Sequence, residues 1–156
     1  MKTKELQGRW NDWLKASDEL LLILHEQTAA VTLRDVSRVE RLQPKLEDQL
    51  ARVAGIDAQA VDQAQRLAES LGTEPTLRGI VEGLDRSEGQ TLHALANRVT
   101  MAARKVQSTM EKNRALIENE MTYVNGTLTL IAKAAGSAPT PYRRRNTGPV
   151  LMDAAA

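Results

Sequence analysis

The sequence predicts an all-α protein, an elongated antiparallel helical bundle with long N- and C-terminal helices and a disordered C-terminal tail. Apolar residues recur at steps of three or four along most of the chain, which places them on one face of a helix. The chain has no Phe and only 3% aromatic residues, so its apolar content is mainly Leu, Ala, Val and Ile. Such side chains suit helix packing better than the aromatic-rich interior of a β-sandwich.

The first half of the chain predicts one long helix over residues 3–53. Its apolar stripe drifts at Leu33 but resumes beyond it, so we expect the helix to continue there. Pro44 removes one backbone hydrogen bond, and we expect a kink because apolar residues stay in phase on both sides. Gly55 and Asp57 then predict the end of this helix and the start of a shorter one over residues 58–71.

The second half predicts a clear interruption at residues 72–75, a few weak helical turns after it, and a long helix over residues 87–135. Ser87, with Gln90 three residues later, fits a capping box at the start of that helix. We therefore expect a helical domain over residues 1–135 and a flexible tail over residues 136–156. This tail holds three of the five prolines of the chain.

Composition bounds the possible functions. Lys plus Arg (21) nearly balance Asp plus Glu (20), so no overall field directs the protein to nucleic acid. The absence of cysteine excludes disulfides and thiolate chemistry and is compatible with a reducing cytoplasm. The longest apolar run, residues 20–24, is far shorter than the roughly 20 residues of a membrane span. We therefore expect a cytoplasmic protein without stable membrane insertion.

Candidate catalytic and metal-ligating residues are lacking. The two histidines, His25 and His93, have no partner at ligand spacing, and the nine glycines form no phosphate-binding loop. We therefore expect no catalytic, cofactor-binding or metal site, and no enzyme. Trp10 and Trp13 share an apolar helical face that can pack against the far end of the last helix, anchor at a membrane surface or bind a protein.

The last helix carries a wider apolar arc than one neighbouring helix needs. Asn113 interrupts its main stripe, either as a buried amide that fixes the register or as a residue that faces water. Beyond Asn113 a second apolar line runs beside the first, which predicts either a groove for a partner helix or contact with a third helix of the bundle. The candidate residues are Leu116, Ile117, Tyr123, Val124, Leu128, Leu130 and Ile131.

The tail contains one aromatic residue, Tyr142, followed by Arg143, Arg144 and Arg145. The arginines can simply solvate a flexible end, or they can dock a protein together with the tyrosine. Binding to nucleic acid is a third possibility, although one aromatic ring and three charges provide neither a stacking platform nor a patch.

Three stretches of the chain resemble the FlgN-type flagellar export chaperones. The first helix is similar to the family's pattern of leucines, Glu, Ala and a central Asp, and the last helix to its Asn-x-x-Leu-Ile signature. The tail is similar to its Thr-x-Tyr followed by Gly, although five residues separate Tyr142 from Gly148, more than the family usually has. The matching residues are Leu21, Leu22, Glu26, Ala29, Ala30, Asp35, Val39, Leu42 and Leu46, then Asn113, Leu116, Ile117, Tyr123, Val124, Leu128 and Ile131, then Thr140, Tyr142 and Gly148.

The resemblance implies a cytoplasmic chaperone for hook-associated proteins of the hook–filament junction. Such a chaperone holds the terminal helices of its cargo, prevents premature assembly and brings the cargo to the flagellar export gate. The wide apolar arc would then bind the cargo, and Tyr142 with the three arginines would dock at the gate. A chaperone for a different secretion substrate and a coiled-coil scaffold also remain compatible with the residues.

Overall fold

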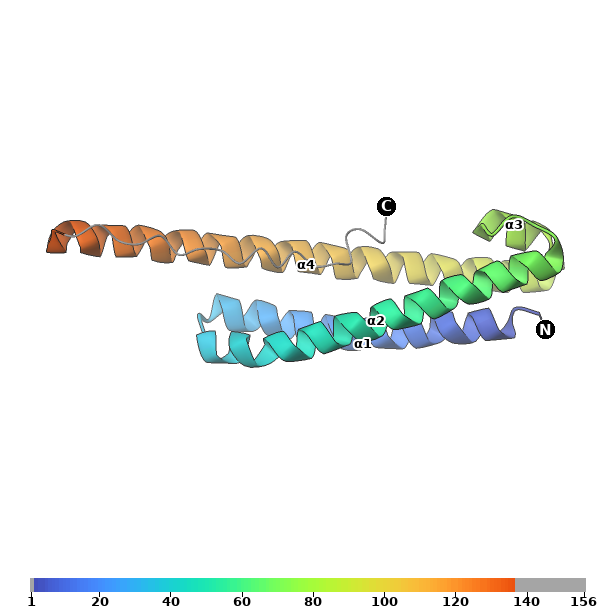
Figure 1. Cartoon of the computed structure of the whole chain (residues 1–156), viewed down its shortest axis with the longest axis horizontal. Helices are drawn as coiled ribbons and strands as arrows, with labels where there is room; N and C mark the ends of the chain where they lie inside the picture. Colours follow the sequence, from blue (N-terminus) through green and yellow to red (C-terminus); the bar gives the residue numbers. More distant parts are fainter. Residues whose placement is uncertain (1, 137–156) are drawn as a thin grey trace.

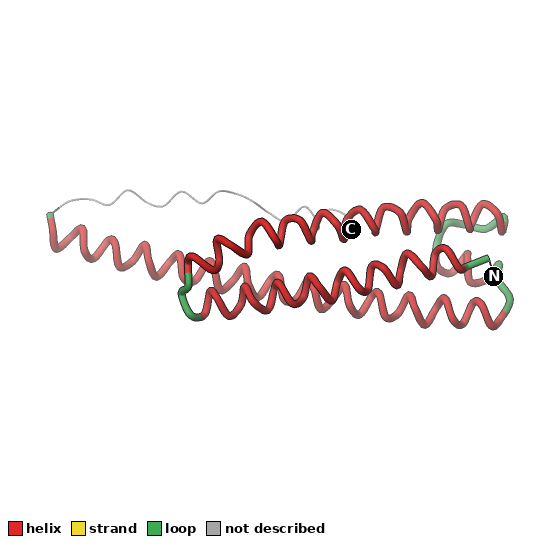
Figure 2. Tube along the Cα trace, turned by 90° about the horizontal axis from the view of Figure 1, so that it is seen from below, coloured by secondary structure: helices red, strands yellow, loops and turns green. Residues whose placement is uncertain are grey.

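The computed structural model describes residues 2–136, which form helices joined by turns and contain no strand. The helices are α1 (Lys4–Thr32), α2 (Val36–Leu71), α3 (Leu77–Glu82) and α4 (Arg86–Ala135). Helices α1 and α2 form a hairpin, and α4 lies along this hairpin and extends past its closed end (Figures 1 and 2). The expected all-α fold, elongated and with a long last helix, is confirmed.

The expected single helix over residues 3–53 is wrong, because the chain reverses at residues 33–35. Arg34 adopts the left-handed conformation with φ of 54°, which turns the backbone out of α1. The carboxylate of Asp35 then accepts a hydrogen bond from the backbone N–H of Arg38 at 3.1 Å and caps the first turn of α2. The phase shift at Leu33 therefore marks a turn and not a drift of the stripe.

Helix α2 is longer than the sequence predicts. It continues through Pro44, as expected, but it also continues through Gly55, where an end was expected, and it ends at Gly72 with φ of 64°. A Cβ added at Gly55 would meet no atom within 4 Å, so close packing does not require this glycine. The helix continues because its buried face is continuous on both sides of Gly55. The buried residues of that face are Leu42, Leu46, Val53, Ala60, Leu67 and Ala68.

Helix α4 begins one residue earlier than expected and has a different cap. The carboxylate of Asp85 accepts a hydrogen bond from the backbone N–H of Glu88 at 2.9 Å, so Asp85, and not Ser87, is the N-cap. Gly136 closes the other end in the left-handed conformation, with φ of 73°. At about 1.5 Å per residue the 50 residues of α4 span about 75 Å, which makes it the longest described element.

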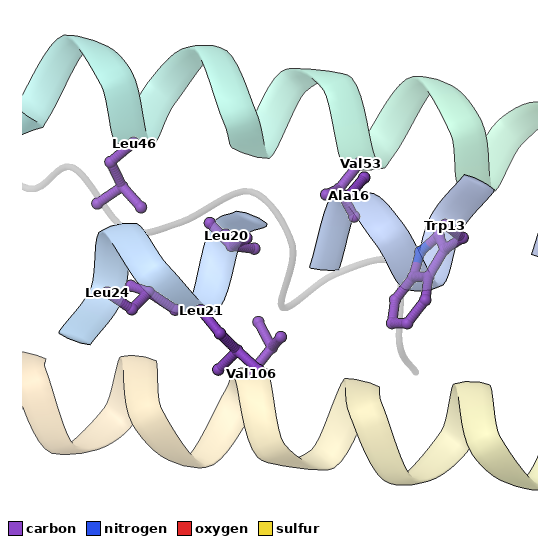
Figure 3. Close-up of a cluster of buried hydrophobic side chains, with 8 residues drawn as sticks. All are labelled: Trp13, Ala16, Leu20, Leu21, Leu24, Leu46, Val53 and Val106. Atoms are coloured by element: carbon purple, nitrogen blue, oxygen red, sulfur yellow. The ribbon is translucent and has the colours of Figure 1, made fainter. Parts of the chain in front are cut away.

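Helix α1 lies between α2 and α4 in the main hydrophobic core (Figure 3). Leu20, Leu21 and Leu24 of α1 are buried with Leu46 of α2 and Val106 of α4 in one cluster. Because α1 packs against both α2 and α4, the apolar surface of α1 is wider than a single stripe. Burying such leucines stabilises the fold by roughly 1.5–3 kcal/mol each.

Helices α1 and α4 run in the same direction, whereas each is antiparallel to α2. Leu6 near the start of α1 shares a cluster with Leu92 near the start of α4, and Arg34 after the end of α1 pairs with Glu120. The tryptophans pack inside the bundle, as one of the alternatives had it, but against the first half of α4 and not its far end. The expected position is wrong because the chain already turns back at residues 33–35. Helix α2 therefore returns to the start of α1, and α4 begins beside the tryptophans instead of ending there.

The strained turn residue Arg34 gives a testable prediction about stability. A non-glycine residue in the left-handed region costs about 1 kcal/mol, a cost that glycine avoids. Arg34→Gly and Arg34→Ala lose the same side-chain contacts, so the difference between them isolates the backbone term. We expect Arg34→Gly to exceed Arg34→Ala by about 1 kcal/mol in free energy of unfolding, measured by chemical denaturation. Equal stabilities would contradict the backbone argument.

Candidate protein-binding surface

The side chain of Asn113 fixes α4 against α1 before α4 leaves the bundle. It is 2% exposed, and its Nδ2 donates to the carbonyl oxygen of Leu24 at 2.8 Å and to Oε1 of Gln27 at 3.0 Å. Its Oδ1 accepts a hydrogen bond from the hydroxyl of Thr28. Since the Leu24 carbonyl can only accept, this orientation of the amide is the one that satisfies all three partners. The prediction that Asn113 is a buried amide is confirmed, and its role in fixing the register stays a prediction.

The turn at residues 33–35 contacts α4 through Arg34. Its Nε lies 2.9 Å from a carboxylate oxygen of Glu120, and its guanidinium carbon lies 4.5 Å from the centroid of the Tyr123 ring. Both charged side chains are at least 36% exposed, so the ion pair contributes less than about 1 kcal/mol. The stacking on Tyr123 adds a cation–π contact of similar size. Arg34 therefore marks the level on α4 at which the hairpin ends.

Beyond this level α4 projects from the bundle. We call residues 124–135 the overhang; at about 1.5 Å per residue it is about 18 Å long. Figures 1 and 2 show it extending past the hairpin turn in two perpendicular views. Its large apolar side chains are exposed: Val124 by 51%, Leu128 by 45%, Leu130 by 70% and Ile131 by 59%. These exposed apolar residues fall within residues 124–131, about two helical turns, whereas Ala132 of the same segment is buried, at 8%.

The seven residues predicted from the sequence to bind a partner fall into two groups. Leu116 and Ile117 are half-buried and lie in the part of α4 that the hairpin covers, between Asn113 and Glu120. Tyr123 and the four apolar residues of the overhang are exposed. The structure thus brings five of the seven together on one open surface. The binding role of all seven stays a prediction.

Sequence reasoning missed the residues that the hairpin turn contributes beside this surface. Arg34 contacts Tyr123, and Leu33 and Val36 of the same segment are exposed by 71% and 67%. They were missed because the chain was expected to continue there as a helix. One signal could have found the turn: Asp35, three residues before Arg38, is a capping residue in front of a new apolar stripe.

The other predicted contact lies outside the described residues. Tyr142, Arg143, Arg144 and Arg145 belong to residues 137–156, and their role stays a prediction. Within residues 2–136 no group of three His, Cys, Asp or Glu side chains could hold a metal ion. Of the two histidines, His93 lies 3.4 Å from the amide nitrogen of Asn97, and His25 is exposed. None of the helices that the structure describes is long and apolar enough to cross a membrane.

An elongated helical bundle with an exposed apolar helix end is typical of a protein-binding module, because such a surface is suited to covering a helix of another protein. Comparison with protein families identifies the module. The model of the FlgN family, described as FlgN protein, matches residues 1–147, and the chain therefore belongs to this family of flagellar export chaperones. A comparison with curated proteins and with solved structures gives no match.

Proposed function

We propose that this protein is a cytoplasmic chaperone that binds hook-associated proteins of the hook–filament junction, prevents their premature assembly and delivers them to the export gate. The observation that supports the proposal is the overhang, where exposed apolar side chains of α4 continue past the last helix that covers this face within residues 2–136. A subunit waiting for export must keep its own assembly helix covered, and an apolar helix surface of this kind can cover it.

The chemistry of the overhang favours a helical cargo segment. Lys133 is the one charged residue among its twelve residues, and the exposed apolar side chains stand at helical spacing. A partner helix with apolar residues at similar steps can therefore interdigitate with them. Because these residues are between 45% and 70% exposed, burying one of them against cargo contributes about 1 kcal/mol, and several must be buried together for stable binding.

The tail provides the proposed second contact. The family match extends to residue 147 and so includes Tyr142 and the three arginines that follow it. A tyrosine combines about 150–250 Å² of ring surface with a hydroxyl group that can form a hydrogen bond. One contact for cargo and another for the gate lie on different parts of the chain, which lets the chaperone hold both at once.

The decisive experiment is a pull-down from motile cells, read by mass spectrometry and followed by titration of the purified protein with each purified hook-associated protein. We expect a direct complex with at least one of them. Direct binding of another exported protein, with none of the hook-associated proteins bound, would replace this proposal by a chaperone for another secretion substrate. Light scattering distinguishes the remaining alternative, because a coiled-coil scaffold self-associates without cargo.

The role of the tail is tested by Tyr142→Ala. We expect this variant to fold and to bind cargo as the unchanged protein does. Docking to the purified gate component and secretion of junction proteins should both decrease. Raised salt should weaken the docking modestly if Arg143, Arg144 and Arg145 contribute exposed charge pairs. Normal secretion by Tyr142→Ala would leave the tail without a docking role.

A further inference from the structure

The face of α4 that α1 covers continues into the overhang in register. Val106 packs in the core cluster with leucines of α1, and Asn113 forms hydrogen bonds to α1. The later members of this face follow at helical steps after α1 has ended, so a helix covering them would occupy the extension of the α1 axis. The face consists of Val106, Met110, Asn113, Ile117, Met121, Val124, Leu128 and Ile131.

The hairpin turn lies at one end of the space that such a covering helix would occupy. Arg34 places the turn level with Tyr123, directly before the overhang, and the exposed side chains of Leu33 and Val36 belong to the same end of the hairpin. A helix lying on the overhang therefore meets the turn with one of its ends. Its other end then points toward the C-terminal end of α4, which extends past the hairpin in Figure 1.

The end of α1 beside this face carries a partial negative charge. The C-terminal end of α1 is the negative end of a helix dipole, and its last turn contains no basic residue to offset it. The positive N-terminal end of α2 beside it is offset by its cap, Asp35, and Arg34 is paired with Glu120. A partner helix is therefore favoured with its positive N-terminus at the turn.

We propose that the cargo helix docks on the overhang as a coaxial continuation of α1, with its N-terminus against residues 33–35 and its axis parallel to α4. This inference rests on the proposed function and adds the direction of the cargo. The contact spans about 12 residues of the cargo helix, since the overhang is about 18 Å long. Helix α1 itself already packs on α4 in this direction, which shows that the face accepts a parallel neighbour.

Site-specific cross-linking tests the direction, because the chain has no cysteine and a single one can carry the label. Ser37→Cys places a photo-cross-linker at the hairpin end, and Ala134→Cys places it at the far end; both positions are exposed. The probe is a purified hook-associated protein encoded in the same genome. We expect the label at position 37 to capture cargo residues that precede those captured from position 134 by about 12 residues.

The possible outcomes distinguish a failure of the docking direction from a failure of the proposed chaperone function. The opposite order of captured residues, or the same residues captured from both positions, would overturn the docking direction while leaving the chaperone function intact. Failure of every hook-associated protein to bind the unlabelled chain would overturn both.

Discussion

Replacing Leu128 and Ile131 together by alanine is expected to weaken cargo binding about 30-fold. Each residue is about half exposed, at 45% and 59%, so cargo binding can bury only this exposed half. Truncation to alanine then loses about 1 kcal/mol at each position, and about 2 kcal/mol in total corresponds to this factor in Kd. Isothermal titration with a purified hook-associated protein measures the effect.

The matched control for this double variant is Met101→Ala. Met101 is also a large apolar residue of α4, exposed by 70%, but it lies in the part of the helix beside the hairpin. We expect it to leave cargo affinity unchanged. The thermal unfolding temperature should change little in either variant, because these side chains contribute little to the core. Normal affinity with a strongly lowered unfolding temperature would show that Leu128 and Ile131 stabilise the fold instead.

The helical fold could be predicted because the apolar period is local information. The stripe of α4 is visible in the sequence, and the structure has the helix within one residue of its expected start. The hairpin turn has a weaker signal in the sequence. Leu33 and Val36 look like further members of an apolar stripe although they are exposed at a reversal, and only the capping residue Asp35 indicates the turn. Conversely, Gly55 looked like a helix end, but packing against α1 overrides its weak local preference.

The candidate surface was predictable in composition but not in extent. The sequence showed that the end of α4 carries more apolar surface than one neighbour can cover. Which residues α1 covers depends on where α1 ends, and the misplaced end of the first helix hid this boundary. Arg34 therefore has no recognisable signature in the sequence: its contact with Tyr123 joins positions 89 residues apart through the turn.

Asn113→Asp is expected to destabilise the bundle by about 3 kcal/mol or more at neutral pH. The amide Nδ2 donates to the Leu24 carbonyl and to Gln27 Oε1, and a carboxylate oxygen in its place would face these two acceptors without a proton. A buried charge without a compensating partner costs about 3–5 kcal/mol. For a domain of this size the unfolding temperature should fall by about 10 °C, which differential scanning calorimetry measures.

The control is Asn119→Asp, an exposed asparagine of the same helix, whose unfolding temperature should change little. The pH dependence identifies the cause of the loss in Asn113→Asp. Burial beside two acceptors raises the pKa of the introduced carboxyl in the folded state above its unfolded value. Stability relative to the unchanged protein is therefore lost as pH rises through that raised pKa and is partly recovered at acidic pH, where the protonated carboxyl can donate to Leu24 as the amide does. A pH-independent loss would show that ionisation of the introduced carboxyl is not the cause of the destabilisation.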